Sequence, residues 1–186
     1  IIHHGLKRMV EQQDNVYYYL TLLNENYPMP GLRAGTEEQI IKGMYLLEEG
    51  AKKTPRVNLL GSGTILRESI AAKALLEKEW GVAANVWSCP SFNELARDGQ
   101  DVERWNLLHP TEKARVPFVA QQLEKYAGPV IASTDYMKNY AEQIRAFMPK
   151  DKGVSRTYKV LGTDGFGRSD FRSKLREHFE INRHYI

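Results

Sequence analysis

Four consecutive small residues, Gly61-Ser62-Gly63-Thr64, are the first candidates for binding chemistry in this sequence. They follow an apolar stretch and precede a helical pattern, so we expect free backbone amides and the Thr64 hydroxyl at a helix N-terminus. The helix dipole and the free amides favour an anion there, which makes the segment a candidate phosphate cradle. It matches neither the dinucleotide-binding fingerprint nor the Walker lysine pattern. A turn whose glycines only permit tight chain reversal is the alternative interpretation.

A second glycine-rich segment, residues 162–170, combines three glycines with charged side chains. Loops of this kind often carry function. Four of its residues are candidates for an interface: Asp164, Phe166, Arg168 and Asp170. The alternative is that Asp164 and Arg168 pair with each other or with a neighbouring subunit. We expect Ser169 or Asp170 to cap the helix that follows.

A third segment, residues 94–106, surrounds one tryptophan with charges of both signs. Tryptophan beside arginine is typical of protein interfaces, so Asp101, Arg104 and Trp105 are candidate interface residues. A solvated helix face is the equally supported alternative.

The histidines and the single cysteine point to no further site. None of the five histidines has the spacing along one helix that metal ligands need, so no metal is predicted. Cys89 follows an apolar stretch without a nearby histidine, so we expect a small buried side chain.

The candidate residues are positioned by one recurring unit: a short apolar strand, a turn of small polar residues, and an amphipathic helix. A helix start is predicted at Ser91, where Glu94 completes a capping box. The four units pair strands with helices at 57–60 and 64–80, 86–88 and 92–97, 130–133 and 136–147, and 158–161 and 171–179. Such alternation predicts an α/β fold, with a mostly parallel sheet and helices on both faces. Ligands of such sheets bind at the carboxyl ends of the strands, where the strand order reverses. We therefore expect the four loops that follow these strands to lie together.

The N-terminal region follows a different pattern. Residues 16–22 are aromatic and β-branched enough to predict a strand, and residues 24–35 are rich in proline and glycine, which predicts a domain boundary. A capping box from Thr36 to Gln39 predicts a helix to about Glu49, ended by Gly50.

Composition excludes several function classes. The 186 residues are 42% hydrophobic with a net charge of +3, too small and too evenly spread for a nucleic-acid footprint. No segment approaches the roughly 20 apolar residues of a membrane span, and one cysteine favours a reducing cytoplasm. We therefore expect a soluble cytoplasmic protein without nucleic-acid or membrane partners. The first residue is not Met and both ends are apolar, which predicts a piece of a longer protein with a missing packing partner.

Six long segments of the chain resemble the homodimeric bacterial pyruvate dehydrogenase family, within the transketolase superfamily. They are residues 16–29, 60–63, 91–101, 104–110, 132–138 and 161–170. The resemblance covers nearly the whole chain. It implies a parent enzyme that uses thiamin diphosphate and magnesium to decarboxylate pyruvate and passes the acetyl group to a lipoyl group of the dihydrolipoyl acetyltransferase component.

The resemblance also implies how the chain is divided into domains and which functions belong to other domains. Residues 1–35 correspond to the tail of the pyrimidine-binding domain and a linker, and residues 36–186 to a transketolase-like C-terminal domain truncated at its C-terminal end. Thiamin diphosphate, magnesium and the catalytic residues belong to upstream domains, so we expect no cofactor on this piece and no activity from it alone. Its implied roles are support of the homodimer and docking of the acetyltransferase. A stand-alone α/β domain that binds a nucleotide or phosphate at residues 61–64 is the alternative.

Overall fold

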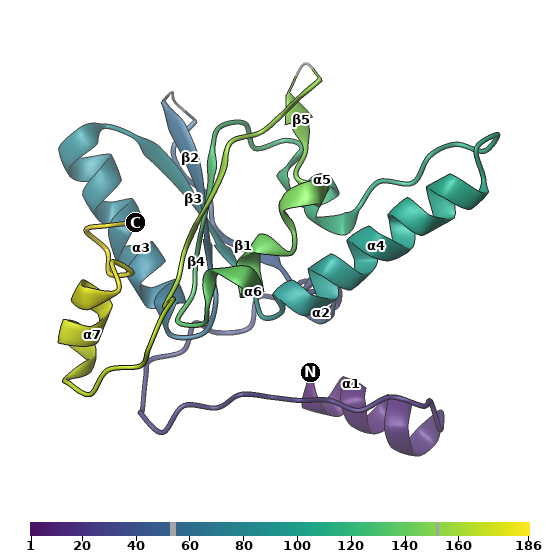
Figure 1. Cartoon of the computed structure of the whole chain (residues 1–186), viewed down its shortest axis with the longest axis horizontal. Coiled ribbons are helices and arrows are strands. Elements are labelled where there is room, and N and C mark those ends of the chain that lie inside the picture. The colour runs from purple at the N-terminus through teal and green to yellow at the C-terminus, as the bar shows by residue number, and fades with distance from the viewer. Residues whose placement is uncertain (53–54, 152) are drawn as a thin grey trace.

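The computed structural model describes residues 1–52, 55–151 and 153–186, and its centre is a five-stranded sheet (Figure 1). The strand order is β1-β3-β2-β4-β7; β1 runs antiparallel to β3, and the other neighbours in this sheet are parallel. The strands are β1 (Tyr45–Glu48), β2 (Arg56–Gly61), β3 (Ala83–Ser88), β4 (Val130–Ser133) and β7 (Tyr158–Leu161). A separate hairpin pairs β5 (Lys150–Asp151) with β6 (Val154–Ser155). The predicted mostly parallel sheet is confirmed.

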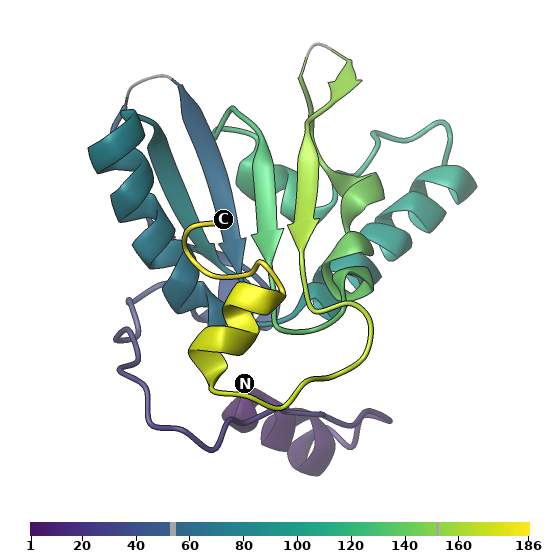
Figure 2. The same cartoon turned by 60° about the vertical axis from the view of Figure 1, so that its left-hand side comes forward.

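Helices cover both faces of the sheet, as predicted (Figures 1 and 2). One face carries α3 (Ile65–Leu75), its π-helical continuation η2 (Leu76–Trp80) and α7 (Arg172–His178). The opposite face carries α4 (Phe92–Leu108), α5 (Phe118–Leu123), α6 (Lys138–Glu142) and the short 3-10 helix η3 (Arg145–Phe147). The remaining helices are α1 (Ile2–Leu6), its π-helical continuation η1 (Lys7–Glu11) and α2 (Glu37–Ile41).

Alternation along the central strand β2 divides the core between the two faces. Val57 and Leu59 pack in a small cluster with Ala72 of α3, whereas Leu60 belongs to the larger cluster beneath α4, α5 and α6. Successive side chains of a strand point to opposite faces, so one strand supplies both cores. This explains why β2 is apolar over most of its length.

A network of buried amide side chains lies on the sheet face that carries the larger cluster. Asn58 is fully buried; its Nδ2 donates to the Tyr126 carbonyl at 2.9 Å, and its Oδ1 accepts from Asn85 Nδ2 at 3.0 Å and Trp87 Nε1 at 3.2 Å. Asn85 Oδ1 in turn accepts from the Gly50 amide at 2.9 Å. Buried polar groups need such partners, and these bonds join β2 to β3 and to the chain before β4.

Two predicted helices have different lengths in the structure. The Ser91 cap is confirmed, since its Oγ accepts from the Glu94 amide at 3.1 Å, but α4 continues to Leu108 instead of ending at residue 97. The predicted helix 136–147 is interrupted after α6, where the Ala141 carbonyl accepts from the Tyr158 hydroxyl and, with 3-10 spacing, from the Ile144 amide. The interruption after α6 depends on the contact with Tyr158, which local sequence does not encode.

The predictions for the first 50 residues are partly wrong. Residues 16–22 form no strand in the described structure, because they lie away from every sheet edge (Figure 1). The helix predicted for residues 36–49 ends at Ile41, and residues 45–48 form the edge strand β1. Gly43 causes the change of direction with a φ of +103°, and the Thr36 hydroxyl donates to the Arg33 carbonyl instead of capping α2.

The first 35 residues form an arm beside the sheet domain (Figure 1). Its α1 helix packs against its own following segment, where the Tyr18 hydroxyl and His4 Nδ1 hydrogen-bond at 2.7 Å and Arg8 pairs with Asp14 at 2.7 Å. Many large apolar side chains of the arm are exposed: Ile2, Leu6, Val10, Tyr17, Tyr19, Leu22, Met29 and Leu32.

Candidate functional site

Three loops meet at the carboxyl ends of β2, β4 and β7, where the strand order reverses (Figure 2). Ser62 Oγ donates to Thr134 Oγ1 at 2.9 Å, and Thr163 Oγ1 donates to the Asp135 carbonyl at 2.7 Å. A pocket of about 330 Å³ opens beside them. It is lined by Leu23, Thr64, Ile65, Asp135, Thr163, Gly165, Gly167, Arg168, Arg172, Leu175, Arg176, Phe179 and Ile181. Of the four loops expected to lie together, those after β2, β4 and β7 therefore meet at this pocket, and the loop after β3 does not line it.

Gly61 and Gly63 require glycine for two different physical reasons. A side chain at Gly61 would overlap the backbone of Leu66, so this position brings the loop close to α3. Gly63 has a φ of +54°, a left-handed conformation that glycine adopts without strain. The tight-turn interpretation therefore accounts for both glycines.

A carboxylate faces the predicted anion cradle. Thr64 precedes α3, and its hydroxyl donates to Asp135 Oδ2 at 3.4 Å. An additional anion at this end of α3 would meet the charge of Asp135, which opposes binding. The guanidinium groups on the other wall of the pocket, Arg168, Arg172 and Arg176, supply the opposite charge. Anion binding by residues 61–64 stays a prediction.

The loop 162–170 is held at its beginning, but not by the bonds expected from sequence. Asp164 Oδ1 accepts from the Lys138 amide at 2.9 Å and its Oδ2 lies 3.6 Å from Lys138 Nζ, so its partner is Lys138 and not Arg168. Asp170 Oδ1 accepts from the adjacent Phe171 amide at 2.7 Å, and neither Ser169 nor Asp170 caps α7, which begins after Phe171. Arg168 forms no hydrogen bond or ion pair with the described residues.

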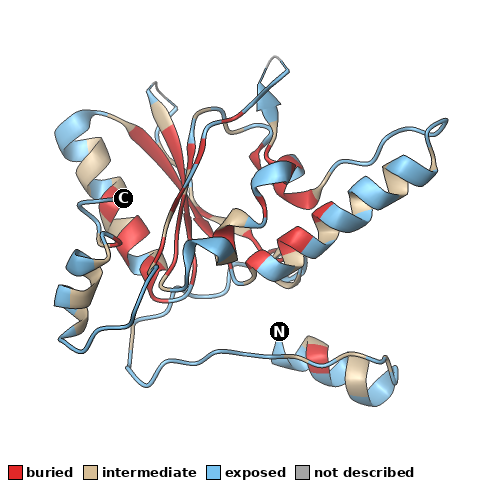
Figure 3. Cartoon of the chain, viewed as in Figure 1, coloured by how far each residue is buried: buried red, intermediate tan, exposed pale blue. Residues whose placement is uncertain are grey.

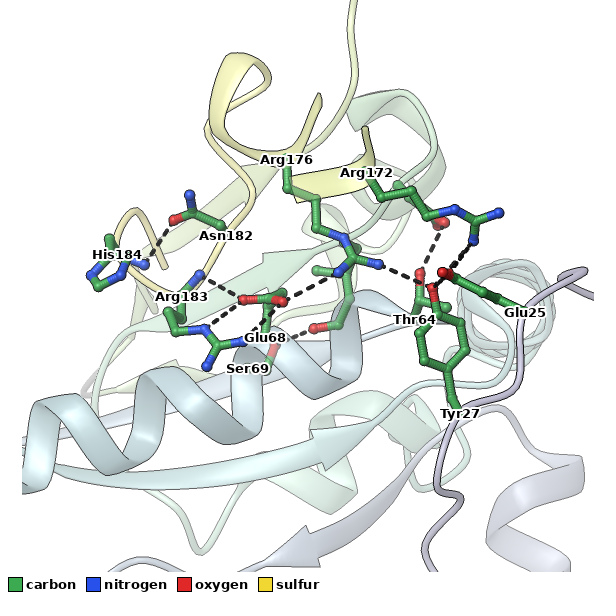
Figure 4. Close-up of polar contacts among 12 residues, drawn as sticks. Glu25, Tyr27, Thr64, Glu68, Ser69, Arg172, Arg176, Asn182, Arg183 and His184 are labelled. Carbon is green, nitrogen blue, oxygen red and sulfur yellow. Dashed lines mark hydrogen bonds and ion pairs between the residues drawn. The ribbon is translucent and has the colours of Figure 1, made fainter. Parts of the chain in front are cut away.

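A buried carboxylate on α3 joins α7 and the C-terminal segment to the sheet domain (Figure 4). Glu68, only 5% exposed, accepts from Arg183 Nε at 2.9 Å, from the Arg183 amide at 3.1 Å and from Arg176 Nη1 at 3.4 Å. Desolvation raises the pKa of Glu68, but the bonds from Arg183 outweigh it, and the pKa lies below its ordinary value. This cluster was not predicted, because a glutamate on a helix is ordinarily solvated and its partners lie more than 100 positions away.

The arm contacts Arg172, which also lines the pocket (Figure 4). Arg172 Nη1 donates to Glu25 Oε2 at 2.6 Å, and its Nη2 donates to Asn24 Oδ1 at 2.8 Å. The Tyr27 hydroxyl donates to Glu25, and the Arg67 guanidinium lies 4.6 Å from the centre of the Tyr27 ring. Residues 24–27 therefore connect the arm to both α7 and α3.

The candidate interface on α4 is partly occupied by its own chain. The Trp105 ring stacks on His109 with ring centres 4.4 Å apart, and the Arg115 guanidinium lies 3.8 Å from the centre of the Trp105 ring. Asp101 and Arg104 are exposed. The free part of this surface is therefore the charged residues and not the tryptophan ring.

No described group of three histidine, cysteine or carboxylate side chains is arranged to hold a metal ion. Cys89 is buried as predicted, and desolvation raises its thiol pKa. Within the described ranges, no helix has the length and apolar character that crossing a membrane requires.

Comparison with known proteins gives one family match and several close relatives. A family model described as the transketolase-like TK C-terminal domain matches residues 43–182. Over the whole chain, proteins named pyruvate dehydrogenase E1 component are 57% identical in Cupriavidus necator, 57% in Pseudomonas aeruginosa and 56% in Escherichia coli K12. The chain spans 20%, 21% and 20% of the length of these relatives.

Two solved structures share the fold at low sequence identity. The transketolase of Campylobacter jejuni aligns with a TM-score of 0.50 at 24% identity, covering 86% of this chain and 19% of that one. A transketolase of Pichia stipitis aligns with a TM-score of 0.51 at 17% identity, covering 84% and 18%. In both, the likeness covers less than a fifth of the other chain.

Proposed function

The chain belongs to the family of transketolase-like C-terminal domains, and from this premise we propose that it is the C-terminal domain of a pyruvate dehydrogenase E1 component. The observation that carries the proposal is the 57% identity to proteins of that name over the entire chain. The parent enzyme decarboxylates pyruvate with thiamin diphosphate and magnesium and transfers the acetyl group to the lipoyl group of a dihydrolipoyl acetyltransferase.

Within that enzyme the sheet domain, residues 36–186, is a structural domain, and residues 1–35 end the preceding pyrimidine-binding domain. The matched range begins at residue 43, so the arm lies outside it, which supports this division. The sheet domain supports a homodimer and offers the exposed charges Asp101 and Arg104 of α4 to the acetyltransferase.

The described residues do not fit thiamin diphosphate and magnesium. They contain no carboxylate or histidine cluster of metal-ligand type, and the glycine turn faces the carboxylate of Asp135, which would repel a diphosphate. The proposal therefore assigns the cofactor, the metal and the catalytic residues to other parts of the parent chain.

Two preparations of the parent test the proposal: the full-length protein and a variant that ends before residue 36. Each is supplied with pyruvate, thiamin diphosphate, magnesium and an isolated lipoyl domain, and acetylation of the lipoyl group is followed by mass spectrometry. We expect acetylation only by the full-length protein, together with a dimer in sedimentation that the truncated variant does not form. A full-length protein that forms no acetyl-lipoyl product would refute the proposal.

The acetyltransferase surface has its own test. The paired charge reversals Asp101→Lys and Arg104→Glu should weaken binding of the purified acetyltransferase without affecting decarboxylation of pyruvate. Because both side chains are exposed, these substitutions should leave the fold intact. Unchanged binding would remove this surface from the proposal.

The alternative, a nucleotide- or phosphate-binding domain, is supported by the pocket and its arginines. Titration with ATP, followed by calorimetry, tests it. Saturable binding that disappears in Gly63→Val would favour this function, since valine at a φ of +54° would distort the loop. Absence of binding would exclude it.

A further inference from the structure

Two phenylalanines of the loop after β7 are among the most exposed apolar side chains in the structure. Phe166 is 91% exposed and Phe171 is 82% exposed, whereas an aromatic side chain normally buries most of its 150–250 Å². Figure 3 shows this loop and most of the arm as exposed. Two such exposed rings on one loop make it a candidate interaction surface.

The loop that carries these rings is fixed in place rather than loose. Asp164 holds its beginning to Lys138, at 2.9 Å from the backbone amide. Arg172 holds its end to Glu25 and Asn24 of the arm, at 2.6 and 2.8 Å. An anchored loop presents its side chains with little further loss of conformational freedom, which favours docking.

The arm also exposes large apolar side chains. Tyr17, Tyr19 and Leu22 are between 84% and 89% exposed, and the arm is joined to the loop through Arg172. The arm also lies outside the matched range 43–182, and the relatives are about five times as long as this chain.

We infer that Phe166 and Phe171 dock against the part of the parent chain that precedes residue 1 in the same subunit. The inference rests on the proposed function, because it requires a longer parent chain whose other domains precede residue 1. In the parent, Phe166 and Phe171 form one interface together with the exposed apolar residues of the arm. Arg172 joins the loop to the arm in the middle of this interface. The loop thereby aligns the sheet domain with the remainder of the enzyme.

Cysteine labelling in the full-length protein tests this interface. Phe166→Cys and Phe171→Cys are prepared separately in a background without other accessible cysteines. The matched control is Val154→Cys, a 72% exposed position on β6. The rate of modification by a maleimide is measured for the folded protein and again in urea. We expect both loop cysteines to react at least tenfold more slowly than the control when folded, and equally fast in urea.

Equal rates at Phe166→Cys and Val154→Cys in the folded protein would overturn the inference. Protection that disappears when the protein is diluted to monomers would also overturn it, because a second copy would then be the occupant. If the substitutions prevent folding, hydroxyl-radical footprinting of the unsubstituted protein measures oxidation of Phe166 itself, and a rate like that of an exposed phenylalanine would refute the inference. None of these measurements needs activity, so failure of the proposed function and failure of this interface are separate outcomes.

Discussion

Replacing Glu68 by glutamine should release the C-terminal segment from α3. The substitution keeps the size of the side chain but removes the charge that Arg183 and Arg176 share. A hydrogen bond to a charged group contributes about 1.5–3 kcal/mol. The Arg183 side chain is 47% exposed and the Arg176 bond is long at 3.4 Å, so water compensates part of the loss. We expect a loss of about 2–3 kcal/mol for docking of this segment.

Hydrogen exchange measures this loss directly, because the Arg183 amide donates to Glu68 Oε2. At a factor of ten for each 1.4 kcal/mol, exchange of the peptide covering residues 180–186 should accelerate about 30- to 150-fold. The peptide of α4 should be unaffected. The control is Glu177→Gln, which removes only an exposed pair with Lys174 and should change exchange about twofold or less. If the two variants behaved alike, the buried role assigned to Glu68 would be wrong.

The same bond gives a pH dependence. The pKa of Glu68 is lower in the folded protein than its ordinary value of 4.5. Its contribution is therefore complete above about pH 4.5 and declines as the pH falls through the lower, folded pKa. The difference between wild type and Glu68→Gln should be constant from pH 6 to 8 and shrink in acid. A difference that grew in acid would contradict the assignment.

Two further substitutions test the core. Asn58→Leu leaves the buried polar partners of this amide unsatisfied and should lower the free energy of unfolding in urea by about 3 kcal/mol or more; a loss below about 1 kcal/mol would contradict the network. Gly99→Ala places a methyl group into the Phe147 ring and should cost about 1–3 kcal/mol, whereas Gly31→Ala, which has open space around it, should cost less than about 0.5 kcal/mol; equal effects would refute the packing assigned to α4.

The parallel part of the sheet was predictable because its signals are local. In each unit a few apolar residues precede small polar ones and a helical pattern, and this order alone specifies the strand, the turn and the helix. Strand β1 was missed because residues 45–48 also fit a helix, and only pairing with β3 selects the strand. Residues 16–22 show the reverse error, since strand-forming side chains need a sheet edge that the arm does not reach.

The candidate site divides in the same way. Topology alone predicted that the loops after all four parallel strands would lie together; those after β2, β4 and β7 meet at the pocket, but the loop after β3 does not line it. The partners of individual side chains were not predictable, because Asp164 bonds to Lys138 and Glu68 bonds to Arg183, which lie far away in the sequence. Such pairings depend on how α7 returns to α3, which no local pattern specifies.

The central position of β2 also constrains synthesis of the chain. One neighbour of β2, strand β3, begins 22 residues after β2 ends. The other neighbour, β4, does not begin until 69 residues after the end of β2. At about 5–20 residues per second, a ribosome needs roughly 3–14 s to supply β4. During that time the middle of the future sheet is an open strand edge flanked by apolar side chains, the kind of edge that pairs with other chains. Completion of β4 is thus the step that closes the edge of β2, and the open edge then lies on β4 until β7 is made.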